Sequence, residues 1–216
     1  MSFPTRLVSR VRAMLPKVVV FDLDGCCWAP ELYELWGGGS PFKENKDGTL
    51  SDRSGTMVHL LGDVKNILYE LKTDPKWKDT IVAVASTCDA PEWARECLRK
   101  FPVGDGLTMS DVFSEDVTEI YEANGKDKHM REIAKKTRVS LDQMIFFDNQ
   151  TNNTSCVAAM EGPTVVYTPE GVTRELFEVR TETAIDIRHI LCVHCFQEGL
   201  SKFPAPGKVL GPKSRW

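Results

Sequence analysis

Two aspartates follow directly on an apolar run near the start of the chain, and their placement suits nucleophilic or acid–base chemistry. The run Val18-Val19-Val20-Phe21 has no polar residue on either face, which is typical of a parallel strand buried between two layers of helices. Asp22 and Asp24 come at its carboxyl end, where ligands collect in such sheets. Because they lie two residues apart on an extended chain, their side chains point the same way. For this segment alone, a solvated Asp-x-Asp-Gly turn is the alternative.

Further polar residues end other predicted strands of the same sheet. Ser86 ends the apolar segment 80–86, and Asp148 and Asn149 end the segment 143–148. Lys126 lies just before a predicted helix. Carboxylates, a hydroxyl and one lysine together suit phosphoryl transfer through an aspartyl phosphate.

Each residue of this set has a role in such a reaction. Asp22 is the predicted nucleophile, and Asp24 the predicted general acid and base. Because a carboxylate and a phosphate repel each other, the site must supply cationic charge. Mg²⁺ does so with one or two carboxylates, for which Asp22 and Asp148 are the candidates. Ser86 and Lys126 are predicted to bind the phosphate.

The elements that must position these residues alternate along the chain, which indicates an α/β domain with a parallel sheet. We predict buried strands at 18–21, 80–86, 143–148 and 164–167, and a weaker one at 111–113. Helices are expected at 63–71, from Pro91 onward, at 127–136, at 172–179 and around 185–196. The polar stretch 29–57 is expected to form loop or hairpin.

Composition narrows the function classes. The chain has 216 residues, 42% of them hydrophobic, and a formal net charge of −4, so we expect one core and no nucleic-acid-binding surface. No apolar stretch approaches the length that crosses a bilayer, so no membrane partner is expected. Seven cysteines without framework spacing favour a reducing compartment. We predict a cytoplasmic location; the alternative is mitochondrial import, since residues 1–16 contain three arginines and no acid.

Four motifs in order resemble the haloacid dehalogenase superfamily of phosphohydrolases, and within it the magnesium-dependent phosphatase-1 family. They lie between about residues 16 and 168 and read Phe21-Asp22-Leu23-Asp24 with Trp28, Ala85-Ser86 with Ala90-Pro91-Glu92-Trp93-Ala94, Glu119-Ile120-Tyr121 before Gly125-Lys126 and His129, and Gln143-Met144-Ile145-Phe146-Phe147-Asp148 with Asn153.

The resemblance implies a Rossmann-like sheet with the nucleophile strand central, no cap domain, and Mg²⁺ dependence. It implies that the backbone carbonyl of Asp24 is a metal ligand, together with Asp22 and Asp148. It also implies transfer of phosphate from a monoester to Asp22 and then to water. An open site favours an exposed phosphate, as on a sugar, phosphotyrosine or a protein. The oligomeric state is left open.

Three positions depart from the family pattern. Cys26 stands where a threonine is usual, and a thiol holds a loop less firmly. Thr87, a candidate phosphate contact, stands where relatives tend to have arginine. Asn149 stands where a second aspartate is common, so it is expected to act around the metal ligands without adding charge and to weaken Mg²⁺ binding. The alternative function is therefore a catalytically weak or inactive phosphate-binding or protein-interaction module.

Other residues leave alternatives open. Lys128 competes with Lys126 for the phosphate. Trp28, Tyr33 and Trp36 are expected to form an aromatic wall over the substrate, or else to cover the sheet edge. His129 could contact substrate or make a structural hydrogen bond.

The domain boundaries and the remaining cysteines complete the sequence-based predictions. Cys26 and Cys27 are taken as bystanders. Cys192 and Cys195 have half of a zinc spacing, but we favour a buried helix face there. We predict a basic extension at 1–16, one phosphatase domain at 17–200 and a disordered tail at 201–216.

Overall fold

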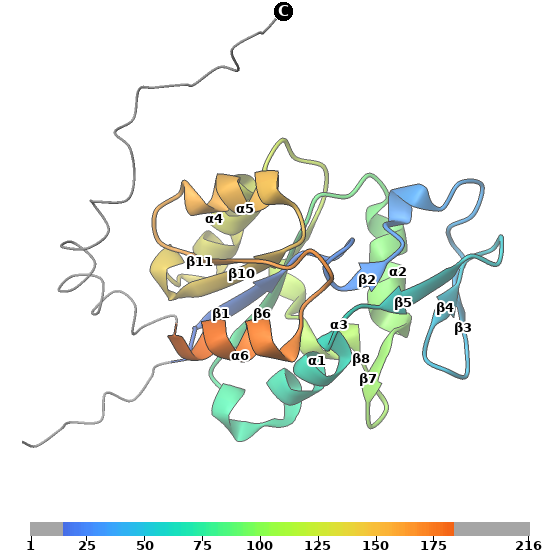
Figure 1. The fold of residues 1–216 in the computed structure, drawn as a ribbon, viewed down its shortest axis with the longest axis horizontal. Coiled ribbons are helices and arrows are strands. Elements are labelled where there is room, and N and C mark those ends of the chain that lie inside the picture. Colours follow the sequence, from blue (N-terminus) through green and yellow to red (C-terminus); the bar gives the residue numbers. More distant parts are fainter. Residues whose placement is uncertain (1–14, 184–216) are drawn as a thin grey trace, which may run out of the picture.

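A five-stranded parallel sheet forms the centre of the molecule (Figure 1). The computed structural model describes residues 15–183. Most of the predicted basic extension, the helix around 185–196, Cys192, Cys195 and the tail lie outside that range. The strand order is β11-β10-β1-β6-β9, with bounds β1 Val18–Phe21, β6 Ile81–Ser86, β9 Thr118–Ile120, β10 Met144–Asp148 and β11 Thr164–Tyr167. The α/β fold and the central position of the strand before Asp22 are thereby confirmed.

Alternate residues of β1 face the two sides of this sheet, and each side has its own apolar layer. Val18 and Val20 pack in a cluster with Met130 and Ile133 of helix α4 (Lys126–Thr137). Val19 and Phe21 pack in the larger cluster, which includes residues of helices α1 (Val64–Thr73), α2 (Pro91–Lys100) and α6 (Arg174–Thr183). Because no face of β1 reaches solvent, the strand is continuously apolar and its polar residues begin only where it ends.

Helices form where the sequence has apolar residues at helical spacing, as predicted. Their bounds are α1 Val64–Thr73, α2 Pro91–Lys100, α3 Met109–Val112, α4 Lys126–Thr137, α5 Thr151–Ala158 and α6 Arg174–Thr183. In Figure 1, α4 and α5 lie on one side of the sheet and α1 and α6 on the other. No helix among residues 15–183 is long and apolar enough to cross a membrane.

The prediction of a strand at 111–113 is wrong. That segment ends the short helix α3, whose start is closed by reciprocal hydrogen bonds between Thr108 and Asp111. This capping arrangement favours helix over strand. The fifth strand is instead β9, which pairs with β6 from Thr118 onward.

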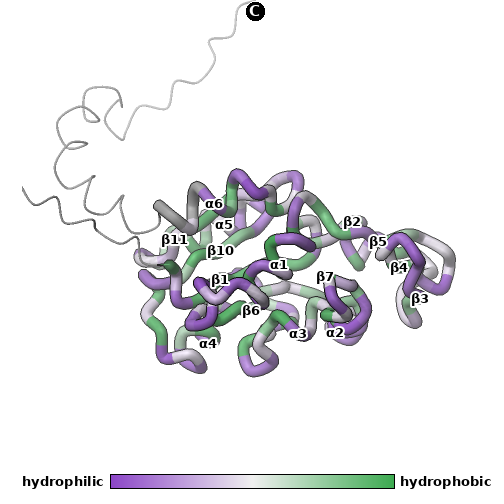
Figure 2. The backbone as a smooth tube through the Cα atoms, turned by 90° about the horizontal axis from the view of Figure 1, so that it is seen from below, coloured by the Kyte–Doolittle hydropathy of each residue, from purple (hydrophilic) through white to green (hydrophobic). Residues whose placement is uncertain are grey.

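The polar stretch after β1 is more ordered than the expected loop or hairpin. It builds an antiparallel sheet in the order β2-β5-β4-β3, with strands β2 Trp28–Ala29, β3 Lys43–Glu44, β4 Leu50–Ser51 and β5 Met57–Leu60. A further hairpin joins β7 Pro102–Gly104 to β8 Leu107–Thr108, and single 3-10 turns lie at Leu32–Glu34, Pro75–Trp77, Glu115–Val117 and Leu141–Gln143. The small sheet extends from the body with β3 at its far end (Figure 2).

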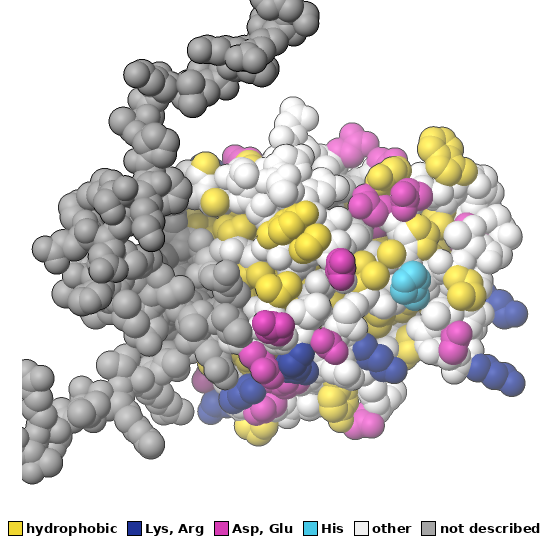
Figure 3. Space-filling view, viewed as in Figure 1, with side chains coloured by type: hydrophobic (Ala, Val, Ile, Leu, Met, Phe, Trp, Pro, Cys, Tyr) yellow, Lys and Arg dark blue, Asp and Glu magenta, His cyan; other side chains and the backbone are white. Residues whose placement is uncertain are grey.

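Charged side chains connect α1 to α6 at the surface, where acidic and basic groups intermingle (Figure 3). The Glu70 carboxylate accepts hydrogen bonds from the Trp77 indole at 3.1 Å and from the Arg174 guanidinium, and it pairs with Lys76 at 2.7 Å. Burial works against the charge on Glu70, but these donors outweigh it and lower its pKa to about 2.

Replacement of Glu70 by glutamine is expected to remove a pH-dependent part of the stability. Because the folded-state pKa of Glu70 lies below its unfolded value, its contribution is present above about pH 4.5 and is lost as the pH falls toward about 2. Since the group is partly exposed, Glu70→Gln should cost about 1 kcal/mol at neutral pH. Urea unfolding of the wild-type and variant proteins at neutral pH and near pH 2 measures this loss of stability. An equal loss at the two pH values would contradict the prediction.

Candidate active site

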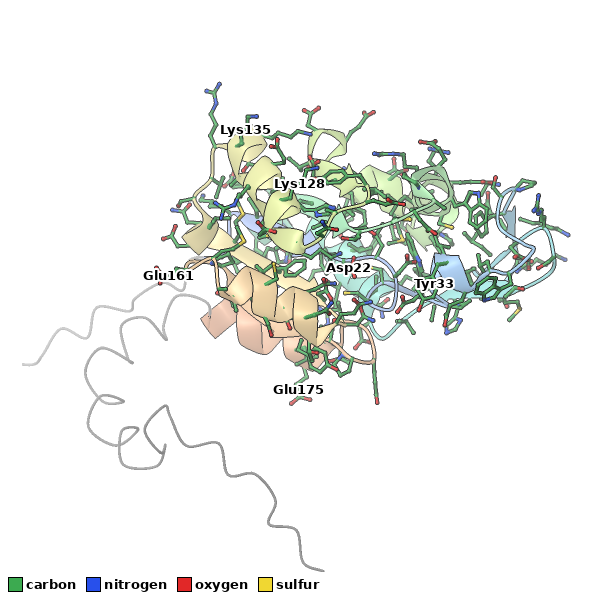
Figure 4. The ribbon with its side chains drawn as sticks, turned by 90° about the horizontal axis from the view of Figure 1, so that it is seen from above. Asp22, Tyr33, Lys128, Lys135, Glu161 and Glu175 are labelled. Carbon is green, nitrogen blue, oxygen red and sulfur yellow. The ribbon has the colours of Figure 1, made fainter. Side chains whose placement is uncertain are left out.

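The polar residues predicted to act together meet at the carboxyl ends of β1, β6 and β10. A cavity of about 310 Å³ opens there. Asp22 lies between the helix that carries Lys128 and the loop that carries Tyr33 (Figure 4). The cavity is lined by residues from the segments that follow β1, β6, β9 and β10 and from the starts of α4 and α5: Asp22, Asp24, Glu31, Tyr33, Thr87, Ala123, Asn124, Gly125, Lys126, Gln150, Asn152 and Asn153.

Lys126 is the cation at the centre of this site. Its side chain is 1% exposed. Its Nζ donates to Asp22 Oδ1 at 2.5 Å and to the carbonyl of Ala85 at 2.7 Å, and it lies 3.6 Å from Asp148 Oδ2. Lys128 lies two residues further along α4, and its Nζ is 4.9 Å from the centroid of the Tyr121 ring. Lys126 is therefore the lysine that contacts both carboxylates. Its role at the phosphate, in preference to Lys128, stays a prediction.

Asp148 is fully buried at the end of β10. Its Oδ1 accepts the backbone N–H of Gln150 at 2.8 Å, and Asn153 Nδ2 lies 3.1 Å from its other oxygen. Burial and then the neighbouring charge of Asp22 raise the pKa of Asp148, against the opposing effect of Lys126. Two buried carboxylates with one lysine between them leave unneutralised negative charge in the site.

Asp24 occupies a different environment from Asp22. Its Oδ1 accepts the indole N–H of Trp28 at 2.6 Å and the backbone N–H of Leu32 at 3.1 Å. Burial raises the pKa of Asp24 to about 7; the Trp28 hydrogen bond opposes this and the charge of Asp22 adds to it. The environment of Asp24 therefore favours its protonated form, whereas the Asp22 carboxylate is paired with the Lys126 amine.

The expected aromatic wall is wrong for Trp28, which is fully buried and stacks on Phe101 at 5.8 Å between ring centroids. The Trp28 indole instead donates its hydrogen bond to Asp24, a contact that could not be predicted from the spacing of the two residues. Tyr33 is 58% exposed and lines the cavity. Trp36 is 86% exposed but is not among the lining residues.

Ser86 has a buried hydroxyl without a hydrogen-bond partner among the described residues. A buried hydroxyl without a partner at the end of β6 is free to form a hydrogen bond to a ligand bound in the cavity. The backbone carbonyl of Ser86 lies 3.1 Å from Nε2 of His129, which is buried and stacks on Tyr121. His129 is therefore placed for a structural hydrogen bond, while Thr87 is exposed on the cavity wall.

The cysteines beside the aspartates are buried and form hydrogen bonds. Cys26 Sγ lies 3.5 Å from the carbonyl of Phe147 and 3.4 Å from the hydroxyl of Thr168. Cys27 Sγ donates to the carbonyl of Asp22 at 3.1 Å. The departure at position 26 thus leaves the loop tied to β10 and to the residue after β11.

Glu31 and Asn149 form a contact that the sequence analysis missed. Asn149 Nδ2 lies 3.5 Å from Glu31 Oε1, a marginal hydrogen bond, and Asn149 Oδ1 is buried without a partner among the described residues. The signal in the sequence was the Glu31-x-x-Glu34 spacing, which forms a capping box but does not reveal that Glu31 faces the cavity.

The donor set suits a hard divalent cation that keeps much of its own water. Within residues 15–183 there is no group of three or more His, Cys, Asp or Glu side chains that would hold a metal ion. Mg²⁺, however, is usually held by one or two carboxylates together with water and substrate phosphate. Asp22 and Asp148, both in contact with the same lysine amine, match that requirement.

Comparison with known proteins gives consistent matches. The chain matches the acid phosphatase family over residues 14–184. It is 32% identical over 145 residues to a HAD-like hydrolase superfamily protein of Schizosaccharomyces pombe, which covers 64% of this chain and 78% of that protein. It is 31% identical over 175 residues to magnesium-dependent phosphatase 1 of Homo sapiens, which covers 79% of this chain and 88% of the human protein.

Two solved structures are also similar. The first is the N-terminal part of the Bacteroides fragilis protein BF1531, containing a phosphatase domain complexed with Mg; it has 17% identity and a TM-score of 0.48. The match covers 82% of this chain and 40% of that one. The second is CbbY from Rhodobacter sphaeroides in complex with phosphate, with 14% identity and a TM-score of 0.47, covering 74% of this chain and 89% of the other.

Proposed function

The chain belongs to the acid phosphatase family of HAD-like hydrolases, and we propose that it hydrolyses phosphomonoesters through an aspartyl phosphate formed on Asp22. One observation carries the proposal. Asp22 pairs with the buried Lys126 amine at 2.5 Å, whereas Asp24 in the same cavity has a pKa raised to about 7 by burial. A paired carboxylate beside a carboxyl group whose protonated form is favoured by burial is the arrangement that a nucleophile and a general acid require.

The reaction has two balanced steps. A carboxylate oxygen of Asp22 attacks phosphorus, the bond from phosphorus to the leaving oxygen breaks, and Asp24 gives its proton to that oxygen. In the second step Asp24 takes a proton from a water molecule, whose oxygen attacks phosphorus and breaks the bond to Asp22. Inorganic phosphate leaves, and both aspartates return to their starting states.

The metal-binding residues in this proposal are the carboxylates of Asp22 and Asp148 and the backbone carbonyl of Asp24. A Mg²⁺ ion bound there supplies the charge that offsets repulsion between Asp22 and the phosphate. Lys126 holds Asp22 in place and neutralises charge on the phosphate, and the unpartnered hydroxyl of Ser86 donates to a phosphate oxygen. Thr87, on the cavity wall, is the remaining proposed phosphate contact.

The substrate in this proposal carries its phosphate on an accessible group, such as a sugar or a tyrosine. The cavity is formed by loops at the end of the sheet, with exposed Tyr33 and Thr87 at its wall. Such a rim can accommodate leaving groups that remain largely in solvent. A cytoplasmic location remains our prediction from cysteine usage.

Trapping of the intermediate tests the mechanism directly. Borohydride reduces an acyl phosphate, so protein quenched during turnover with an aryl phosphate should yield homoserine at position 22. Mass spectrometry of the peptide that contains Asp22 measures this product. Reduction at another residue, or at none while phosphate is released, would rule out Asp22 as the site of phosphorylation.

Replacement of Asp24 by asparagine should reduce turnover unequally for different substrates. An alkyl phosphate needs a proton on its leaving oxygen, so Asp24→Asn should lower kcat by about 10²- to 10⁴-fold. Release of an activated aryl alcohol needs less assistance, so formation of the intermediate should be nearly normal and its hydrolysis slow. A single-turnover comparison of both substrates measures the difference, and an equal loss for both steps and both substrates would contradict the role of Asp24.

A further inference from the structure

Position 149 carries an amide where the resemblance leads one to expect a second carboxylate, and the structure indicates how the chain accommodates it. Asn149 directs its Nδ2 toward Glu31 Oε1 at 3.5 Å. Its Oδ1 is buried with no hydrogen-bond partner among the described residues. A buried acceptor left without a donor is unfavourable, so a donor at this position would stabilise the site.

Glu31 and Asn149 meet beside Gly25, in the loop that follows Asp24. A Cβ placed on Gly25 would lie 2.1 Å from Asn149 Nδ2 and 2.9 Å from Glu31 Oε1. Gly25 also has a φ of +71°, which favours glycine. The missing side chain at position 25 therefore makes room for this pair beside the proposed metal ligands.

The charges of the cavity are unbalanced. Lys126 is the only basic residue among the described residues that line it. Asp22 and Glu31 also line it, and buried Asp148 lies 3.6 Å from the same lysine. Together with Asp24, which also lines the cavity, four carboxyl groups face one ammonium. A divalent cation offsets part of this excess, and loss of Glu31 would remove one of the four acidic groups.

We propose that Glu31 supplies the negative charge around the metal that position 149 lacks, by accepting from metal-bound water and holding the Asn149 amide so that its Oδ1 accepts from a second water. This inference rests on the proposed function, because it concerns the same Mg²⁺ site. It departs from the expectation that Asn149 alone weakens metal binding. Glu31, which lies between β2 and the 3-10 turn at Leu32–Glu34, would thus interact with the water bound to the metal and not with the metal itself.

The electrostatic surroundings of Glu31 agree with such a role. Burial raises its pKa, the Asn149 amide opposes this, and the charges of Glu34 and Asp22 raise it further. A carboxylate held among other carboxylates gains from a nearby cation.

Calorimetric titration of the metal-free protein with MgCl₂ tests the proposal without use of activity. Glu31→Gln keeps the size of the side chain and removes its charge, so the Kd for Mg²⁺ should increase by about 10- to 100-fold. Asn149→Asp in the Glu31→Gln background should restore most of the affinity. The effects of the two substitutions on the Kd should therefore be non-additive, because a carboxylate at either position can supply the required charge.

Glu34→Gln is the matched control, because Glu34 lies on the same turn and is not among the lining residues. It should change the Kd by less than about twofold, as expected for an exposed charge. Circular dichroism of each variant verifies folding, and the Asn149→Asp rescue keeps the test valid if Glu31→Gln is less stable.

The outcomes separate this proposal from the proposed function. If wild-type protein binds Mg²⁺ and Glu31→Gln binds it equally well, the role of Glu31 is refuted while the phosphatase proposal stands. If wild-type protein shows no Mg²⁺ binding even with inorganic phosphate present, both are refuted. A loss in Glu31→Gln that Asn149→Asp does not restore would show that Glu31 acts through structure and not through charge.

Discussion

Replacement of Asp22 by asparagine is expected to abolish phosphate release from aryl and alkyl phosphates alike. An amide oxygen is a poor nucleophile, and the other carboxylate near the Lys126 amine, that of Asp148, lies further from it, at 3.6 Å against 2.5 Å for Asp22. Removal of a covalent nucleophile costs on the order of 10⁴-fold or more in kcat. Phosphate release with Mg²⁺ in excess, compared between wild-type and Asp22→Asn protein, measures the effect.

Two observations separate this loss from misfolding. Asparagine keeps an oxygen that can accept from the Lys126 amine, and Lys126 retains its bond to the carbonyl of Ala85 at 2.7 Å. The free energy of unfolding of the variant should therefore lie within about 1–2 kcal/mol of the wild-type value. If wild-type protein releases phosphate no faster than Asp22→Asn, the phosphatase hypothesis fails, and the alternative of a catalytically inactive binding module is favoured.

The sequence was sufficient for those parts of the fold that depend on local pattern. The buried strands at 18–21, 80–86 and 143–148 could be predicted because their residues are largely apolar on both faces. The strand at 164–167 lies at the edge of the sheet and exposes Tyr167, and it could be predicted from its β-branched and aromatic residues. The helix α5 could not, since its residues Thr151–Ala158 are mostly small and polar and show weak periodicity. The strand expected at 111–113 failed because local capping by Thr108 and Asp111 outweighed a short apolar pattern.

The residues of the candidate site were predictable where their role follows from the end of a strand. Asp22, Ser86 and Asp148 fall there because parallel strands present their carboxyl ends at one edge. Trp28 and Glu31 were not predictable in the same way. Both lie in the segment after β1, whose path is set by pairing with distant β5 and by the 3-10 turn at Leu32–Glu34.

Lys126→Met is expected to destabilise the folded protein strongly, independently of any effect on activity. The amine is buried and contacts both Asp22 and Asp148. Methionine fills a similar volume but leaves two carboxylates facing each other without a cation. Breaking a buried ion pair by removal of one partner costs about 3–5 kcal/mol, and urea unfolding in metal-free buffer at neutral pH measures this cost.

Two additions show whether the cost arises from charge or from packing. If charge is the cause, Asp22→Asn in the Lys126→Met background should recover part of the lost stability, because one of the two repelling carboxylates is then neutral. Mg²⁺ should also stabilise Lys126→Met more than wild type, since a bound cation replaces the missing positive charge. Lys128→Met is the matched control: this neighbouring lysine lies over the Tyr121 ring, so its loss should cost about 1 kcal/mol or less. Equal destabilisation by both lysine variants, or no recovery in the double variant, would show that Lys126 stabilises the fold by packing and not by neutralising the two aspartates.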